Sequence, residues 1–237
     1  MSAPALTAEA PWKAGLRGAR ANLLPGLALQ VAALGLVLAY YFNAPFHALL
    51  ERLSAFRAET GLGYAMVATP VFGGLLPFLY LRADPATRAR HPWAHLPFFM
   101  GFWLWKGVEV DLLYKGLAAS VGAGHDLVTI SIKVLIDQLA YNPLWAAPTG
   151  VLAFAWKDCG FRWRPLRADL AAGRWYARRV WPALLSTWGV WIPAVSLIYA
   201  LPSSLQLPLF NVVLCFWTLL FSHVVTPAAS APRPGRE

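Results

Sequence analysis

Residues 23–42 read LLPGLALQVAALGLVLAYYF, a stretch without a single charged side chain. A helix needs about 20 mostly apolar residues to cross the hydrocarbon core of a bilayer, so this stretch predicts a transmembrane helix. Five further segments have a similar length, and two of them carry charges. The predicted spans are about residues 23–42, 61–81, 94–119, 127–156, 180–200 and 205–225. The expected fold class is all-α, a polytopic transmembrane bundle of about six helices.

The composition of the whole chain agrees with a membrane protein and excludes other classes. Of the 237 residues, 58% are hydrophobic and 13% are charged, whereas soluble globular proteins have about 45–50% and about 25%. A soluble protein of this size could not cover its surface with so few charges. The same values exclude a disordered chain, and two cysteines, Cys159 and Cys215, exclude a disulfide-rich secreted module. Twelve Trp and eight Tyr suit membrane interfaces.

The basic residues predict the orientation in the membrane. Cytoplasmic loops carry an excess of Lys and Arg, and a six-span topology with both termini in the cytoplasm places most bases there. The excess of bases on this side, together with contact to anionic lipid headgroups, accounts for the net charge of +9. The chain has no motif for binding nucleic acid. The bases on that side are Lys13, Arg17, Arg20, Arg82, Arg88, Arg90, Lys157, Arg162, Arg164, Arg167, Arg174, Arg178, Arg179, Arg233 and Arg236.

The chain divides into three predicted regions. Residues 1–22 form a cytoplasmic N-terminal segment, in which we expect Pro4 and Pro11 to break any amphipathic helix. Residues 23–226 form the transmembrane helical domain. Residues 227–237, PAASAPRPGRE, have the composition of a disordered tail.

The predicted span 94–119 carries two oppositely charged pairs. Ionisable residues in a span cost about 2.5–3.5 kcal/mol each on insertion scales and are functional candidates. Helical spacing brings Lys106 to Glu109 and Asp111 to Lys115, on nearly opposite faces. We therefore expect this helix inside the bundle. Lys106, Glu109 and Asp111 then either line a path or only hold helices together.

The predicted span 127–156 concentrates polar groups near the middle of the membrane. Asp137 lies about 15 Å along the helix from residue 127, near the midplane of a core about 30 Å thick. Thr129, Lys133, Asp137 and Tyr141 share one stripe at α-helical spacing, and Lys133 and Asp137 are placed to pair. A hydrated path or ion site is one interpretation, and a polar clasp between helices is the other. The candidate residues are Lys133, Asp137, Gln138 and Asn142.

Prolines, glycines, small polar residues and arginines give four further expectations. We expect helix kinks at Pro143, Pro148, Pro182 and Pro193. We expect the segment 61–81, with Pro70, Gly73, Gly74 and Pro77, to be bent and closely packed. The stripe Asn211, Cys215, Thr218 and Ser222 serves close helix packing or lines a path. The loop 157–179 is expected to contact anionic lipid headgroups through Arg162, Arg164, Arg167, Arg174, Arg178 and Arg179.

Motifs for common chemistries are missing, so we expect no enzyme, no cofactor and no metal. The chain has no phosphate-binding loop, no G-x-S-x-G, no H-E-x-x-H and no G-x-G-x-x-G. His91 and His95 are four residues apart, but no third ligand is near in sequence. We interpret them as interfacial histidines.

Several motifs match a known family. Residues 133–143, KVLIDQLAYNP, meet a K-x-x-x-D-Q-x-x-x-x-P signature through Lys133, Asp137, Gln138 and Pro143. Trp181, Pro182 and Pro193 fit a W-P…P spacing, and Trp217 with Ser222 fits W-x-x-x-x-S. On these motifs, residues 95–225 resemble the Mpv-type mitochondrial inner-membrane proteins and the peroxisomal membrane proteins of twenty-two kilodaltons. Leu185, Trp188, Gly189 and Leu197 stand where the family usually has polar groups or an aromatic.

The resemblance implies an integral membrane protein without enzymatic activity. Some members of the family behave as weakly selective channels. We expect a channel or carrier path for ions or small solutes, with Asp137 setting a preference for cations. The alternatives are a non-transporting membrane scaffold, a lipid-binding protein, or a lipid-modifying enzyme that uses Glu109 and Asp137. The expected partners are membrane lipids and the solute. Nucleic acid is not an expected partner, and a homo-oligomer is possible. The expected location is a bacterial inner membrane, or a mitochondrial inner or peroxisomal membrane in a eukaryote.

Overall fold

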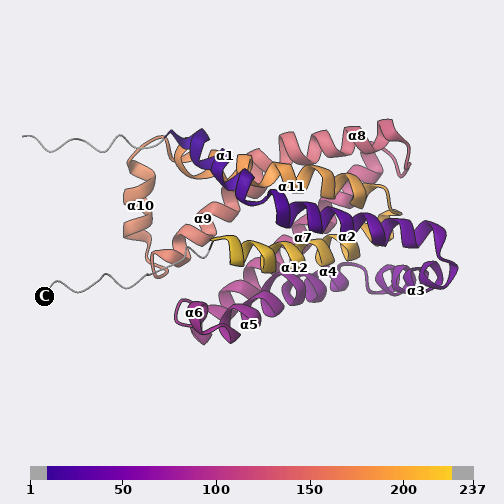
Figure 1. The fold of residues 1–237 in the computed structure, drawn as a ribbon, viewed down its shortest axis with the longest axis horizontal. Coiled ribbons are helices and arrows are strands. Elements are labelled where there is room, and N and C mark those ends of the chain that lie inside the picture. Colours follow the sequence, from indigo (N-terminus) through magenta and orange to yellow (C-terminus); the bar gives the residue numbers. More distant parts are fainter. Residues whose placement is uncertain (1–9, 226–237) are drawn as a thin grey trace, which may run out of the picture.

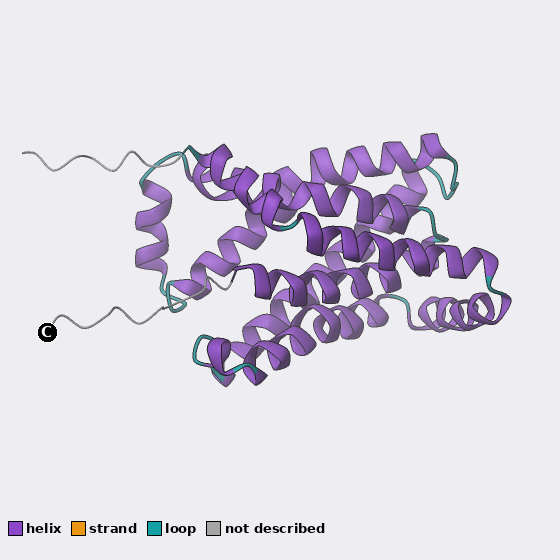
Figure 2. Ribbon diagram, viewed as in Figure 1, coloured by secondary structure: helices purple, strands orange, loops and turns teal. Residues whose placement is uncertain are grey.

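The computed structural model describes residues 10–225, and the side chains as far as residue 219. Figures 1 and 2 show helices joined by short loops, and residues 10–225 contain no strand. The predicted all-α class is therefore confirmed. The tail predicted to be disordered, 227–237, and Pro4 lie outside the described residues.

The helices follow one another with few intervening residues. Three of them, η1, η3 and η4, are π-helical, and η2 is a 3₁₀-helix. The elements are α1 (Pro11–Ala21), α2 (Leu23–Phe42), α3 (Ala44–Thr60), α4 (Leu62–Thr69), η1 (Pro70–Leu75), α5 (Leu76–Ala83), α6 (Pro85–Arg88), η2 (Trp93–His95), α7 (Leu96–Ser120), α8 (Leu127–Leu135), η3 (Ile136–Ala146), α9 (Ala147–Asp158), α10 (Trp163–Ala171), η4 (Tyr176–Val180), α11 (Trp181–Tyr199) and α12 (Ser203–Val225).

Within residues 10–225, three helices are long and apolar enough to cross a membrane. They are Leu23–Phe42, Leu62–Ala83 and Tyr176–Tyr199, close to the predicted spans 23–42, 61–81 and 180–200. The second and third run without a break through a π-helical stretch, η1 and η4 respectively. The other long helical runs pack on them, since α7 contacts α4 and η1, α8 contacts α11, and α12 contacts α2 and α11 (Figure 1).

Helix α12 lies at the centre of the hydrophobic core. It packs against α2, α3, α5, α7, α11 and η1. Leu205, Leu207, Val213 and Leu214 of this helix are almost completely buried. The core residues of α2, α7 and α11 surround them, so the bundle is held together around α12.

Glycines allow helices to approach closely beside α7. A Cβ atom on Gly73 would lie 2.7 Å from side-chain atoms of Leu214 and Trp103. A Cβ atom on Gly107 would lie 2.6 Å from the carbonyl oxygen of Ala65. Both distances are well inside van der Waals contact, so only glycine fits at these crossings. The close packing predicted for the segment 61–81 is confirmed.

Changing Gly107 to Ala should lower the free energy of unfolding by about 1–3 kcal/mol, because α4 and α7 must move apart to relieve the overlap. Gly116 is the matched control on the same helix, since a Cβ atom there meets nothing within 4 Å. Thermal unfolding in detergent micelles measures both variants. Equal midpoints for Gly107→Ala and Gly116→Ala would contradict the crossing.

The N-terminal segment contains a helix, contrary to the prediction for Pro11. Proline is well tolerated in the first turn of a helix, where its missing N–H needs no partner, and Pro11 begins α1. Helix α1 packs on α11, with Gly15 against Leu185 and Gly18 against Ser186. The segment is therefore part of the bundle.

Side-chain caps start three of the other described helices, α3, α6 and α8, and that of α6 is Asp84, which accepts from the Ala86 amide at 2.9 Å. Asn43 caps α3 by accepting a hydrogen bond from the Phe46 amide at 3.0 Å. Asp126 caps α8 by accepting from the amides of Val128 and Thr129 and from the Thr129 hydroxyl. These hydrogen bonds, led by that of the Thr129 hydroxyl, hold the pKa of Asp126 below its ordinary value.

The basic segment 157–179 is partly helical rather than a simple loop. Its six arginines are all exposed, and α10 lies among them. Asp169 forms ion pairs with Arg178 at 3.2 Å and Arg179 at 3.4 Å. Partial burial raises the pKa of Asp169, but these arginines outweigh that effect and the pKa lies below its ordinary value.

Candidate functional site

A cavity of about 750 Å³ lies inside the bundle. It is lined from η1, α5, α6, α7, η3, α9, α11 and α12, but not from α2. At one end it reaches Arg90, His91, Lys157 and Asp158, near α6 and the end of α9 (Figure 1). At the other end it stops at buried Tyr114 and Asp137. Its size is that of pockets that hold small organic molecules, about 300–1,000 Å³.

Aromatic side chains form much of the wall between the two ends. Phe99 and Phe102 of α7 contact Phe154 of α9, with ring centroids 5.9 Å and 5.1 Å apart. Trp191 of α11 lies 5.8 Å from the ring of Phe210 on α12. These rings make the middle of the cavity apolar, and polar groups gather at its deep end.

The π-helix η3 places the polar residues of the deep end. A π-helix is wound more widely than an α-helix, with i→i+5 hydrogen bonds, so side chains four and five residues apart share a face. Asp137, Gln138, Tyr141 and Asn142 all line the cavity. The amide of Asn142 donates to the Gln138 side chain at 3.2 Å. Three predicted site residues of this helix therefore come together in the cavity.

The predicted pairing of Lys133 with Asp137 is wrong. The chain changes from α-helix to π-helix at Ile136, and the wider turn rotates Asp137 away from Lys133. Asp137 instead accepts hydrogen bonds from the Tyr199 hydroxyl at 2.6 Å and from Gln138 at 3.0 Å. In the described part of the chain, Lys133 has no ion pair, and its ammonium lies 5.9 Å from the ring centre of Tyr199. Lys133 is buried but does not line the cavity.

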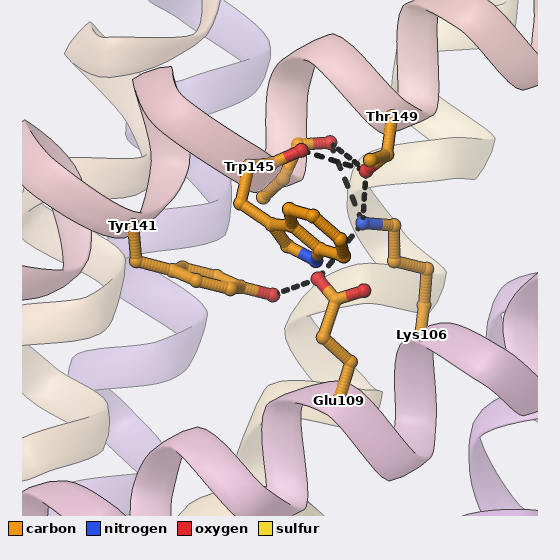
Figure 3. A network of polar contacts seen from close by, with 6 residues as sticks. Lys106, Glu109, Tyr141, Trp145 and Thr149 are labelled. Carbon is orange, nitrogen blue, oxygen red and sulfur yellow. Dashed lines mark hydrogen bonds and ion pairs between the residues drawn. The ribbon is translucent and has the colours of Figure 1, made fainter.

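Lys106 and Glu109 join α7 to the polar helix, as Figure 3 shows. The Lys106 ammonium donates to Glu109 at 2.8 Å and to the Thr149 hydroxyl at 2.9 Å. Tyr141 donates a hydrogen bond to the same Glu109 oxygen. Lys106 and Tyr141 line the cavity, whereas Glu109 accepts a hydrogen bond from each of them and does not itself line the cavity. The predicted Lys106–Glu109 pair is confirmed.

Asp111 does not line the cavity, and its contacts fit the second of its two expected roles, that of holding helices together. It pairs with Arg57 of α3 at 2.7 Å and with Lys115 at 2.6 Å. The Asp111–Lys115 pair was expected from helical spacing. Arg57 could not be predicted, because its partner lies 54 residues away and α3 carries too many charges to suggest a buried face.

The remaining candidates divide between wall and packing. Thr218 lines the cavity, whereas Asn211 and Cys215 do not, and the side chain of Ser222 lies outside the described part. Three of the four candidate prolines lie in or just after a π-helix, where bends occur. Pro143 lies within η3, Pro148 and Pro182 lie in the first turns of α9 and α11, and Pro193 lies inside α11.

Within residues 10–225, His, Cys, Asp and Glu form no group of three or more that could hold a metal ion. His91 Nδ1 lies 3.0 Å from the Thr87 carbonyl oxygen.

No protein-family model, curated protein or solved structure matches the chain. The geometry of the cavity is thus the basis for any functional conclusion.

Proposed function

We propose that this protein is a six-span membrane protein that carries ions or small solutes through the cavity between α7 and η3. The cavity itself supports this proposal. It reaches exposed residues at one end and stops at Asp137 and Tyr114 at the other. A cavity whose lining runs from exposed to buried residues suits a carrier, in which binding and a change of shape alternate, better than an open channel.

The six-span topology is supported by the pairing of charged side chains within the bundle. In α7, Lys106 pairs with Glu109 and Asp111 pairs with Arg57 and Lys115, which reduces the cost of placing these groups in a membrane. The exposed arginines of 157–179 and the cavity mouth lie at the same end of the bundle (Figure 1). By the positive-inside rule this end faces the cytoplasm, with both termini there, in a bacterial inner membrane.

Asp137 gives the path its preference for positive charge. It is 5% exposed, and both of its hydrogen-bond donors are neutral. A carboxylate at the end of a narrow cavity favours cations over anions. We assign no catalytic role to it, since the chain carries none of the common catalytic motifs beside it.

The test is solute efflux from liposomes that contain the purified protein, with Asp137→Asn as the variant. We expect vesicles with the wild type to release a cationic solute faster than empty vesicles, and the variant to lower that rate at least about tenfold, because the charge that favours cations is gone. Asp126→Asn is the control, since this carboxylate caps α8 and lies outside the cavity.

A non-transporting scaffold is the second candidate, because the buried ion pairs are satisfied within the chain. If they serve only as clasps, vesicles will stay tight with both wild type and Asp137→Asn while both proteins are folded and inserted. That result would overturn the carrier proposal.

A further inference from the structure

We propose that the cavity binds a bulky organic cation, a quaternary or protonated amine-like charge on an apolar body. This inference rests on the proposed function, and it names the class of solute that the same site would take. Three features of the described residues carry it: the charge balance inside the cavity, the aromatic wall and the position of the carboxylate.

The charges that face the interior of the cavity do not cancel. Lys106 is neutralised by Glu109 at 2.8 Å, and at the mouth Lys157 is neutralised by Asp158 at 2.7 Å. Asp137 has no cationic partner within the described part of the chain, and the groups that bind it are the phenol of Tyr199 and the amide of Gln138. The interior therefore carries one uncompensated negative charge at its closed end. Arg90 adds a positive charge, but it is exposed at the mouth and screened by water.

The walls between the mouth and Asp137 suit the apolar body of such a cation. Faces of Phe, Tyr and Trp rings attract cations, most strongly where water is excluded. Phe102, Trp103, Tyr114, Tyr141, Trp191 and Phe210 all line the cavity. The cavity already uses this attraction, since the Lys106 ammonium lies 6.0 Å from the ring centre of Phe102.

A small hydrated metal ion fits these walls poorly. Such an ion needs several oxygen ligands, and the deep end offers one carboxylate among rings and amides. A bulky organic cation needs one opposite charge and a large apolar surface, and the volume of about 750 Å³ is sufficient for a drug-sized molecule. The site therefore selects for charge and bulk together.

The experiment compares two probes of the same shape and opposite charge. Tritiated tetraphenylphosphonium and tritiated tetraphenylborate are measured in separate samples by scintillation proximity on the purified full-length protein in detergent, because the two ions precipitate each other in one solution. Each label is displaced with its own unlabelled ion. We expect saturable binding of the cation and at least about tenfold weaker binding of the anion.

Two variants locate the binding. Asp137→Asn should weaken cation binding at least about tenfold by removing the charge. Gly150→Phe should abolish it by filling the cavity, since Gly150 lines the cavity and a Cβ atom there meets only the Phe102 ring, at 4.0 Å. Gly101→Phe, on the outer face of α7 where nothing lies within 4 Å, should leave binding unchanged. If Asp137→Asn fails to fold, Gly150→Phe against Gly101→Phe decides.

The outcomes separate this inference from the proposed function. Equally tight binding of tetraphenylborate, or full binding of tetraphenylphosphonium by Gly150→Phe, overturns the inference. Absent cation binding with liposome efflux that still depends on Asp137 overturns the inference and leaves the proposed function standing. Absence of both binding and efflux overturns both.

Discussion

Replacing Asp111 by Leu should lower the free energy of unfolding by about 3–5 kcal/mol. The carboxylate is completely buried and pairs with Arg57 at 2.7 Å, and Arg57 is itself 6% exposed. Arg57 also donates to the carbonyl oxygen of Ser203 at the start of α12. Loss of the carboxylate leaves a buried guanidinium without its opposite charge, so α3, α7 and α12 should separate more easily.

The test uses a double-mutant cycle and a surface control. Arg57→Met with Asp111→Leu should recover most of the lost stability, because no buried charge is left alone. Asp169→Leu makes the same change in an exposed pair with Arg178 and should cost no more than about 1 kcal/mol. Unfolding midpoints in a titration with sodium dodecyl sulfate measure all four variants, which are Asp111→Leu, Arg57→Met, their double variant and Asp169→Leu. A double variant no more stable than Asp111→Leu would show that the pair has no clasp role.

Local spacing predicted the contacts that arise within one regular helix. Lys106 with Glu109 and Asp111 with Lys115 follow from three- and four-residue spacings in α7, and both pairs form. The bounds of Leu23–Phe42 follow from an apolar run without charges. Information of this kind lies in neighbouring residues, so it can be derived from the sequence alone.

The arrangement of the cavity depends on features that periodicity does not reveal. The predicted stripe from Lys133 to Tyr141 assumes α-helical spacing, and the π-helix that begins at Ile136 changes the register within it. Lys133 then turns away, while Gln138 and Asn142 join Asp137 on one wall. Tyr199, which holds Asp137, lies 62 residues later. The residues around Pro143 give no signal for a π-helix, so only the folded chain shows it.

Breaking the ion pair of Lys106 and Glu109 is the second change with a large expected effect on the free energy of unfolding. Lys106→Met leaves Glu109 buried without a cation, and Glu109→Gln leaves Lys106 buried without an anion, since their side chains are 7% and 10% exposed. Each change should lower the free energy of unfolding by about 3–5 kcal/mol, and the double variant should recover most of that loss. The unfolding midpoint of each purified variant in detergent measures this part.

The two single variants should differ in cation binding, although they lose similar stability. Lys106→Met removes a positive charge that faces the cavity, so the interior becomes more negative and tetraphenylphosphonium should bind at least as tightly as to wild type. Glu109→Gln leaves Lys106 uncompensated, and its charge opposes that of Asp137, so binding should weaken at least about tenfold. The double variant changes the net charge by nothing and should bind like wild type. If instead both single variants weaken binding equally, in proportion to their loss of folded protein, then the pair acts on the cavity only as a clasp, and the charge of the interior does not select the solute.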